Sequence, residues 1–277
     1  MDARLQRRIQ RYGWDRAADR YDAGWDDALR PARERLFAHA NLRVGERVID
    51  EACGTGAIAV AAARRVGPGG SVLARDLSAE MVARCRAAGE AAGLTNLRVE
   101  RGDAEDPVAP ATTDDGLDAA LCALGLMYMP DPEQALLAMA GALRPGGRLA
   151  VAVWGERRHC GWAEVFPIVD ARVSSEVCPL FFRLGSGDAL HLALQGCGVA
   201  VPRIERVAAT LRYPTLALAC EAALYAGPVA LALSRLDGEG RAAVAAEYAA
   251  SIRDFREGDG YAIPGEFVVG SGRVGAS

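Results

Sequence analysis

Two glycines and two carboxylates have the spacing of a nucleoside-binding turn within residues 47–76. Gly54 and Gly56 follow an apolar run that ends at Asp50, and Asp76 follows a second apolar run. Glycines allow a tight turn whose N–H groups stay open to a ligand, and an acid at a strand end can accept hydrogen bonds from ribose hydroxyls. The chemistry that these residues predict is the binding of a nucleoside.

The residues around this turn have the composition of a strand, a helix and a second strand. Val48 and Ile49 are β-branched, as buried parallel strands favour, and residues 57–65 are strong helix formers. The sequence GPGG at residues 67–70 ends the helix, and residues 71–74 give the next short strand. Together they predict a βαβ unit.

The same alternation continues to residue 154. Ser78 is a good N-cap for a helix over residues 79–92, and Asp131 caps a later helix. Further strands are predicted at residues 97–100, 117–123 and 148–154. Short turns between alternating strands and helices predict a doubly wound parallel α/β sheet.

Beyond residue 155 the alternation stops. Strands are predicted at residues 203–213 and 262–269, and the alanine-rich stretch between them is helical, with breaks at Gly227 and Gly238. The two strands could pair antiparallel, with the helices folded back as a cap. We therefore expect one compact domain with three parts, namely residues 1–40, a core of residues 41–155, and late strands with a helical substrate cap in residues 156–277.

Residues 1–40 are predicted to be helical. Leu5, Ile9, Tyr12 and Trp14 give the first helix a loose apolar face among arginines. Tyr21 lies in the aromatic run that follows. This segment either closes as a lid over a bound ligand or is a solvated helix that covers the sheet.

Composition argues against several classes of protein. The net charge of −4 disfavours nucleic-acid binding, and residues 214–234, the most apolar stretch, are too interrupted for a membrane span. The seven cysteines are scattered and form no CxxC pair, so neither a disulfide framework nor a metal site is expected. The first ten residues lack the apolar core of a signal peptide, which predicts a cytoplasmic protein. We expect a monomer or a homodimer.

Five motifs follow one another in an order typical of one enzyme family: VIDEACGTG, ARDLSAEM, VERGDAED, LDAALCALGLMYMPDP and LRPGGRLAVAVW. With them, residues 12–212 resemble the class I S-adenosylmethionine-dependent methyltransferases. They are most similar to the bacterial small-molecule group that includes the ubiquinone/menaquinone C-methyltransferases. The resemblance implies a Rossmann-like sheet of seven strands with the last strand antiparallel, and S-adenosyl-L-methionine as the cofactor.

The resemblance also implies roles for single residues. Asp76 would accept both ribose hydroxyls, Leu77 would pack on the adenine, and Asp103 would accept from the adenine amino group. An acid at a strand end is often only a helix cap, but three of them beside a glycine turn favour binding. The cofactor contacts that the resemblance implies are Tyr21, Asp50, Ala52, Cys53, Gly54, Gly56, Asp76, Leu77, Met81, Gly102, Asp103, Ala104 and Cys122.

Glu51 departs from the family pattern, which usually has a small apolar residue at this position. A carboxylate in a central strand is costly to bury unless it is paired. Glu51 either pairs with an arginine or a backbone donor, or faces the acceptor as a hydrogen-bond acceptor or a catalytic base.

Aromatic residues after the fourth predicted strand mark a candidate acceptor pocket. Tyr128 could contact the transferring methyl group or could be a core residue, and His159 is either a general base or a surface histidine. The other pocket residues predicted are Met127, Trp162, Phe181 and Phe182. Their side chains favour an aromatic or apolar acceptor, although such residues also pack on one another.

The function that we expect is methyl transfer from S-adenosylmethionine to a small-molecule acceptor, by in-line displacement in a water-excluded pocket. The GxGxxA match of residues 54–59 also fits a nicotinamide-dependent oxidoreductase. A non-catalytic S-adenosylmethionine-binding protein is a third alternative. A macromolecular acceptor is disfavoured because ALGL follows the fourth strand in place of an NPPY-like tetrapeptide.

Overall fold

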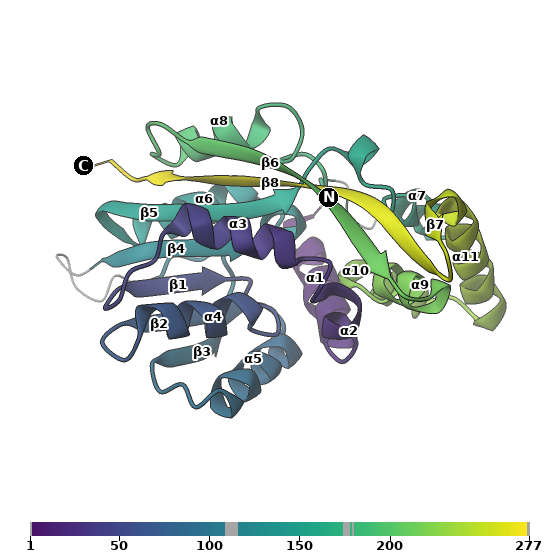
Figure 1. Ribbon diagram of the computed structural model, residues 1–277, viewed down its shortest axis with the longest axis horizontal. Coiled ribbons are helices and arrows are strands. Elements are labelled where there is room, and N and C mark those ends of the chain that lie inside the picture. Colours follow the sequence, from purple (N-terminus) through teal and green to yellow (C-terminus); the bar gives the residue numbers. More distant parts are fainter. Residues whose placement is uncertain (1, 109–115, 174–177, 179, 276–277) are drawn as a thin grey trace.

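One mixed β-sheet organises the computed structural model, which describes residues 2–108, 116–173, 178 and 180–275 (Figure 1). The strands are β1 (Arg47–Glu51), β2 (Ser71–Asp76), β3 (Leu97–Arg101), β4 (Leu117–Ala123), β5 (Leu143–Trp154), β6 (Arg203–Tyr213), β7 (Arg256–Glu257) and β8 (Gly260–Arg273). They lie in the order β3-β2-β1-β4-β5-β8-β6, with β7 paired to β8 outside this path. Strands β1 to β5 run parallel, whereas β8 is antiparallel to both β5 and β6.

Helices pack on the sheet and form a cap beyond it. The α-helices are α1 (Ala3–Ala17), α2 (Tyr21–Trp25), α3 (Arg30–Ala40), α4 (Ala57–Val66), α5 (Ala79–Ala91), α6 (Pro132–Gly141), α7 (Val165–Asp170), α8 (Ala189–Gly196), α9 (Leu216–Leu224), α10 (Gly227–Leu233) and α11 (Gly238–Ser251). Short 3₁₀ helices are η1 (Leu126–Tyr128), η2 (Arg157–His159) and η3 (Arg253–Phe255). Helices α9 to α11 stand beyond the sheet, and α1 and α2 contact α10 and α9, respectively (Figure 1).

The path of the chain across the sheet decides where the loops lie. From β1 the chain moves outward to β2 and β3, then returns to β4 beside β1 and moves outward again to β5. Because parallel crossovers are right-handed, the helices of these two halves cover opposite faces of the sheet. The loops after β1 and β4 therefore diverge, and a crevice opens at the carboxyl ends of the strands.

This architecture confirms the predicted doubly wound α/β sheet with an antiparallel last strand and helices inserted among the late strands. The differences from prediction are local. Strand β7 adds an eighth, two-residue strand, β8 extends beyond residues 262–269, and Asp76 is the last residue of β2. Strand β5 begins at Leu143 because Leu143 already pairs with Leu117, before a shift in register.

The buried face of α1 differs from the apolar face of its sequence. Leu5 and Tyr12 are each 45% exposed. The buried residues are Gln6, Gln10, Gly13 and Ala17. A Cβ atom on Gly13 would lie 2.5 Å from the carbonyl oxygen of Gly227, so α1 approaches the start of α10 too closely for a larger side chain. Close packing on a small residue, rather than hydrophobicity, thus orients α1.

Two kinds of feature are not found in the part of the chain that the structure describes. No single helix there has the length and apolarity to cross a membrane. Helices α9 and α10 meet the length and apolarity required only when they are counted as one segment, and the chain bends by 93° between them. No cluster of three or more His, Cys, Asp or Glu residues that could hold a metal ion occurs among the described residues.

A buried ion pair joins the segment before β1 to β5. Arg148 donates from Nη2 to Glu46, and from Nε to the carbonyl oxygen of Ala40 at 2.8 Å. Glu46 also accepts from the backbone N–H of Arg43 at 2.8 Å. Because both charged side chains are buried, each depends on the other for its hydrogen bonds.

Removal of one partner of this pair should destabilise the fold. We expect Glu46→Ala to lower the free energy of unfolding by about 3 kcal/mol, because the Arg148 guanidinium would stay buried without its carboxylate. Urea denaturation followed by circular dichroism measures this change. Glu133→Ala, which breaks the half-exposed pair with Arg183, is the matched control and should cost less than about 1 kcal/mol. Equal losses in the two variants would contradict the prediction.

Candidate active site

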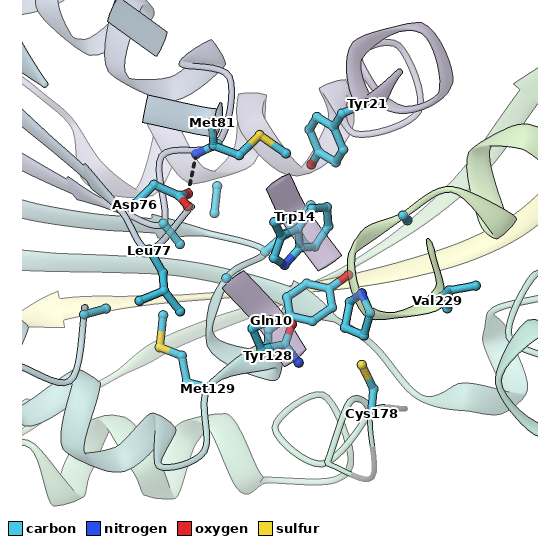
Figure 2. Close-up of a pocket in the computed structure, with 18 of the residues that line it drawn as sticks. Gln10, Trp14, Tyr21, Asp76, Leu77, Met81, Tyr128, Met129, Cys178 and Val229 are labelled. Carbon is cyan, nitrogen blue, oxygen red and sulfur yellow. Dashed lines mark hydrogen bonds between the residues drawn. The ribbon is translucent and has the colours of Figure 1, made fainter. Parts of the chain in front are cut away.

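A cavity lies at the carboxyl ends of the parallel strands, in the crevice where the chain reverses (Figure 2). The space between its walls is about 1170 Å³ when the mouth is included. Residues of α1, α2, α7, α9 and α10 line the side opposite the strand ends. The strand-end side consists of Ala52, Gly54, Asp76, Leu77, Met81, Gly102, Asp103, Ala104, Glu105, Ala123, Leu124, Gly125 and Trp154.

The loop after β1 turns through left-handed backbone conformations. The φ angle is 54° at Ala52, 54° at Gly54 and 101° at Gly56. At Ala52 this conformation is strained, because the residue has a side chain, and strain of this kind is common at functional sites. A Cβ atom on Gly56 would lie 2.9 Å from Sγ of Cys85, whereas one on Gly54 would meet open space. The absence of a side chain at Gly56 therefore allows the start of α4 to pack closely on α5. The absence of a side chain at Gly54 leaves space between this loop and the cavity.

Asp76 is held at the end of β2 by two backbone groups. Its carboxylate accepts from the N–H of Gly54 at 2.9 Å and from the N–H of Ser78 at 2.9 Å. Burial raises the pKa of Asp76 to about 6, although these N–H donors oppose the shift. The carboxylate thus has a fixed position between the loop after β1 and the start of α5.

Two acids after β3 share one cation from α1. Arg7 donates from Nε to Asp103 at 2.8 Å and from Nη2 to Glu105. The backbone N–H of Glu105 donates to the other carboxylate oxygen of Asp103 at 3.1 Å. The Asp103 carboxylate is therefore oriented toward the cavity by a side chain from the opposite wall.

Two more contacts hold the N-terminal helices against the loops of the cavity. Ser78 Oγ donates to Asp15 at 2.6 Å, and Thr55 Oγ1 donates to Asp22 at 2.7 Å. Together with Arg7, these contacts connect α1 and α2 to the loops that follow β1, β2 and β3. This arrangement is the one that a lid would need, and the lid function of residues 1–40 stays a prediction.

Aromatic rings form much of the wall opposite the strand ends. Trp14 lies edge-on to Tyr128 with centroids 5.0 Å apart, and Tyr128 lies edge-on to Phe181 at 5.2 Å. Trp162 continues the wall, 5.6 Å from Phe181. Burial raises the pKa of Tyr128 well above its usual range, which favours the protonated hydroxyl.

The structure gathers most of the predicted cofactor residues around this cavity. Those that line it are Tyr21, Ala52, Gly54, Asp76, Leu77, Met81, Gly102, Asp103 and Ala104. Tyr128 and Trp162, from the predicted acceptor pocket, line it as well. This clustering is the geometry that the predicted roles in binding require.

Other predicted site residues lie behind the wall. Those described but not part of the lining are Asp50, Cys53, Gly56, Cys122, Met127, Phe181 and Phe182. A Cβ atom on Gly125 would lie 2.5 Å from Cβ of Ala52 and 2.9 Å from Sγ of Cys122, so the loops after β1 and β4 close over the strand ends. Asp50 is fully buried beneath them, and burial raises its pKa well above the usual range.

Glu51 pairs with an arginine and does not line the cavity. Its buried side chain places Oε1 3.2 Å from Nη1 of Arg75. Arg75 in turn donates from Nη2 to the backbone carbonyl oxygen of Asp103 at 2.6 Å, and a Cβ atom on Gly102 would overlap its guanidinium. The structure therefore favours the pairing alternative over one in which Glu51 faces the acceptor. Glu51 acts through Arg75 on the position of the loop after β3.

His159 is likewise not among the described residues that line the cavity. Its Nδ1 lies 3.0 Å from Oε1 of Glu266, and its side chain is 46% exposed. Glu266 also accepts from Arg206 at 3.0 Å and from the N–H of Glu156 at 2.9 Å. The structure thus places His159 in a polar cluster on β8, which does not favour its predicted role as a base.

Sequence reasoning missed the residues that the helices contribute to the cavity. Arg7, Gln10 and Trp14 recur at helical spacing on one face of α1, and Phe166 and Val229 come from α7 and α10. Sequence reasoning assigns Trp14 to the apolar face of the first helix but not to the site. Arg7 and Gln10 are polar, so a search for apolar periodicity could not find them.

Comparison with known proteins assigns a class to this site. Residues 42–164 match a family model described as a methyltransferase domain. This segment contains β1 to β5 and the loops that carry Asp76 and Asp103. The fold and the position of the cavity agree with this match, which covers less than half of the chain. The predicted resemblance to the class I S-adenosylmethionine-dependent methyltransferases is confirmed.

The chain spans about half the length of the curated relatives that it matches. Nocamycin O-methyltransferase of Saccharothrix syringae is 36% identical over 138 residues, which cover 50% of this chain and 48% of the relative. Aklanonic acid methyltransferase DauC of Streptomyces sp. (strain C5) is 32% identical, with coverages of 50% and 61%. Demethylmenaquinone methyltransferase of Listeria welshimeri is 33% identical, with coverages of 48% and 56%.

Solved structures share the fold over most of the chain. A protein described as a putative methyltransferase from Bacillus halodurans has a TM-score of 0.61 at 19% identity, covering 89% of this chain and 100% of its own. The [4+2]-cyclase SpnF has a TM-score of 0.58 at 21% identity, with coverages of 92% and 83%. Because one of these proteins is a cyclase, the fold alone does not decide the reaction.

The Glu51–Arg75 contact makes stability depend on the residue at position 51 and on pH. Glu51→Leu should cost about 3 kcal/mol because Arg75 stays buried without its side-chain oxygen acceptor, whereas Glu51→Gln keeps an oxygen for the guanidinium and should cost less. Burial raises the pKa of Glu51 to about 8, although Arg75 opposes the shift. The stability of the wild type relative to Glu51→Gln should therefore be greatest below the unfolded pKa of 4.5 and should fall as pH rises through about 8.

Urea denaturation of the three proteins at several pH values measures both effects. Because Gln does not titrate, the difference between wild type and Glu51→Gln isolates the contribution of Glu51 from that of other acids. A difference that stays constant with pH, or a leucine variant as stable as the glutamine variant, would contradict this description of the pair.

Proposed function

We propose that the protein transfers a methyl group from S-adenosyl-L-methionine to a small-molecule acceptor. The observation that carries the proposal is the placement of Asp76 and Asp103 at the carboxyl ends of neighbouring strands, in the wall of one cavity and within the segment that matches a methyltransferase domain. A cofactor with a ribose and an adenine needs such hydrogen-bond acceptors for its hydroxyls and its amino group.

The residues of the cavity fit this cofactor. Asp76 would accept from the ribose hydroxyls, Leu77 would pack on the adenine, and Asp103 would accept from the adenine amino group while the Ala104 N–H donates to the ring. The Asp103 carboxylate has lone pairs beyond those that Arg7 and Glu105 use. The open space beside Gly54 leaves room for the methionine part.

When bound, the cofactor would supply a methyl group on a positively charged sulfur, and its transfer to the acceptor's nucleophilic atom would leave S-adenosylhomocysteine, together with a proton if the acceptor is a hydroxyl group. The protein's part is to hold the acceptor in line and to exclude water. Two features support both tasks. The rings of Trp14 and Tyr128 form an aromatic wall, and hydrogen bonds hold α1 and α2 against the loops of the cavity.

A small-molecule acceptor is supported by the relatives, which are named for nocamycin, aklanonic acid and demethylmenaquinone. The net charge of −4 supports the absence of nucleic acid as a partner. We also propose that the protein acts in the cytoplasm, as a monomer or a homodimer.

One observation favours a second candidate function. The fold of this chain is also that of a [4+2]-cyclase, so the cavity could serve a reaction other than methyl transfer. The nicotinamide-dependent alternative rests on the GxGxxA match alone, because the family model matched over residues 54–59 is that of a methyltransferase domain.

Isothermal titration should show binding of S-adenosylhomocysteine and no binding of NADH. Asp76→Ala should weaken S-adenosylhomocysteine binding by at least about 10-fold, because a charged acceptor for two hydroxyls is lost. Glu133→Ala is the control, because Glu133 is not among the described residues that line the cavity, and it should bind as the wild type does. Transfer of labelled methyl groups from S-adenosylmethionine to a metabolite extract then tests catalysis. Binding of the cofactor without any transfer would favour the second candidate.

The affinity for S-adenosylhomocysteine should rise with pH through about 6, the pKa to which burial raises Asp76. Only the ionised carboxylate accepts from both ribose hydroxyls, so below this pH the affinity should fall toward about 10-fold per pH unit. Above about pH 7 it should level off. Asp76→Asn should bind weakly and without this dependence. A profile for the wild type that is as flat as that of the Asn variant would remove Asp76 from the proposed site.

A further inference from the structure

Gln10 of α1 presents a buried carboxamide to the cavity with no hydrogen-bond partner stronger than a thiol. The residue is 4% exposed and lines the cavity, yet neither Nε2 nor Oε1 has a nitrogen or oxygen partner among the described residues. Burial raises the pKa of Cys178 and a hydrogen bond with Gln10 opposes that shift, but a thiol is too weak a hydrogen-bonding group to satisfy an amide. Figure 2 shows Gln10 among the side chains that surround the cavity.

Trp162 supplies a second buried polar group to the same cavity. It is 5% exposed, and its Nε1 has no acceptor among the described residues. Trp25 also lines the cavity, but its Nε1 donates to the carbonyl oxygen of Ala222 at 3.0 Å. Buried polar groups in native proteins are nearly always paired. Two unpaired groups from distant parts of the chain that line one cavity therefore indicate that a ligand supplies their partners.

The charged residues of the described lining already have partners. They are Arg7, Asp76, Asp103 and Glu105. Arg7 lies one helical turn before Gln10, but it donates to both Asp103 and Glu105. An anionic or cationic acceptor beside Gln10 and Trp162 would therefore be buried without a free counter-ion, which is costly.

We infer that the acceptor is a neutral, largely apolar molecule with at least two oxygen functions, one accepting from the indole N–H of Trp162 and one paired with the Gln10 carboxamide. This inference rests on the proposed function and names its substrate class. An indole N–H only donates, so its partner is a ketone, ether or hydroxyl oxygen. A carboxamide both donates and accepts, so a ketone or a hydroxyl group fits it.

Gln10 and Trp162 are then specificity-determining residues. An analogue that lacks the oxygens would leave both groups buried and unpaired, and a site built in this way rejects such analogues strongly. The apolar remainder of the acceptor would pack against the rings of Trp14 and Tyr128, which lie edge-on to one another in the same wall.

Matched aromatic probes test this substrate class. Equilibrium dialysis with saturating S-adenosylhomocysteine measures the binding of naphthalene-2,6-diol, naphthalene and naphthalene-2,6-dicarboxylate. The wild type should bind the diol about 10-fold more tightly than naphthalene, and the dicarboxylate most weakly. Gln10→Leu and Trp162→Phe should each reduce the preference for the diol by about fivefold, with naphthalene bound as tightly as before or more tightly.

Gln6→Leu is the matched control, because Gln6 is another buried glutamine of α1 that is not in the described cavity lining. This variant should keep the wild-type preference for the diol. An unchanged preference in both test variants, tighter binding of the dicarboxylate, or failure of all three probes to bind would overturn the inference. If S-adenosylhomocysteine itself fails to bind, the proposed function fails instead.

Thermal unfolding of the ligand-free protein separates a role in specificity from a structural one. Gln10→Leu and Gln10→Met should keep the wild-type Tm or raise it by up to about 4 °C, because a buried unpaired amide is removed. A fall in Tm larger than that of Gln6→Leu would show that the Gln10 amide is satisfied in the folded protein, and would overturn the inference.

Discussion

The reversal of the chain between the adjacent strands β1 and β4 is the constraint on which the rest of the structure depends. Right-handed crossovers send the helices of the two halves to opposite faces, so the loops after these strands must part. Ala52 and Leu124, with φ angles of 54° and 59°, turn the chain at both edges of the opening. Gly125 lets the two loops pack over the strand ends beneath it. The position of the cavity is thus set by the topology of the backbone, and the side chains determine only its lining.

Buried carboxylates connect the loops around this opening. Asp76 at the end of β2 accepts from the backbone of the loop after β1, and Glu51 in β1 holds Arg75, which donates to the backbone of the loop after β3. Each acid has a partner from a different element, which is what its burial requires. The loops therefore behave as one cross-connected unit, and a ligand that contacts one of them contacts a rigid frame.

Local patterns were sufficient for the strands, the glycine turn and the acids at strand ends, because those features depend on residues close in sequence. Local patterns failed where residues distant in sequence determine the exposure or the pairing of a side chain. Leu5 faces solvent because Gly13 packs against the backbone of Gly227, and this contact has no local signature. The partner of Glu51 is Arg75 only because β1 and β2 pair in the register that places these two residues opposite one another. An unpaired amide such as that of Gln10 is visible only when its whole surroundings are known.

The two walls of the cavity come from different parts of the chain. The strand-end wall lies within residues 42–164, whereas α1, α2, α7, α9 and α10 lie outside the segment that matches the methyltransferase domain. Substitutions in these helices can alter which molecules fit while the loops that carry Asp76 and Asp103 stay as they are. A family built in this way can diversify its chemistry by exchanging one wall, and its members would then resemble one another over only part of their length, as this chain and its relatives do.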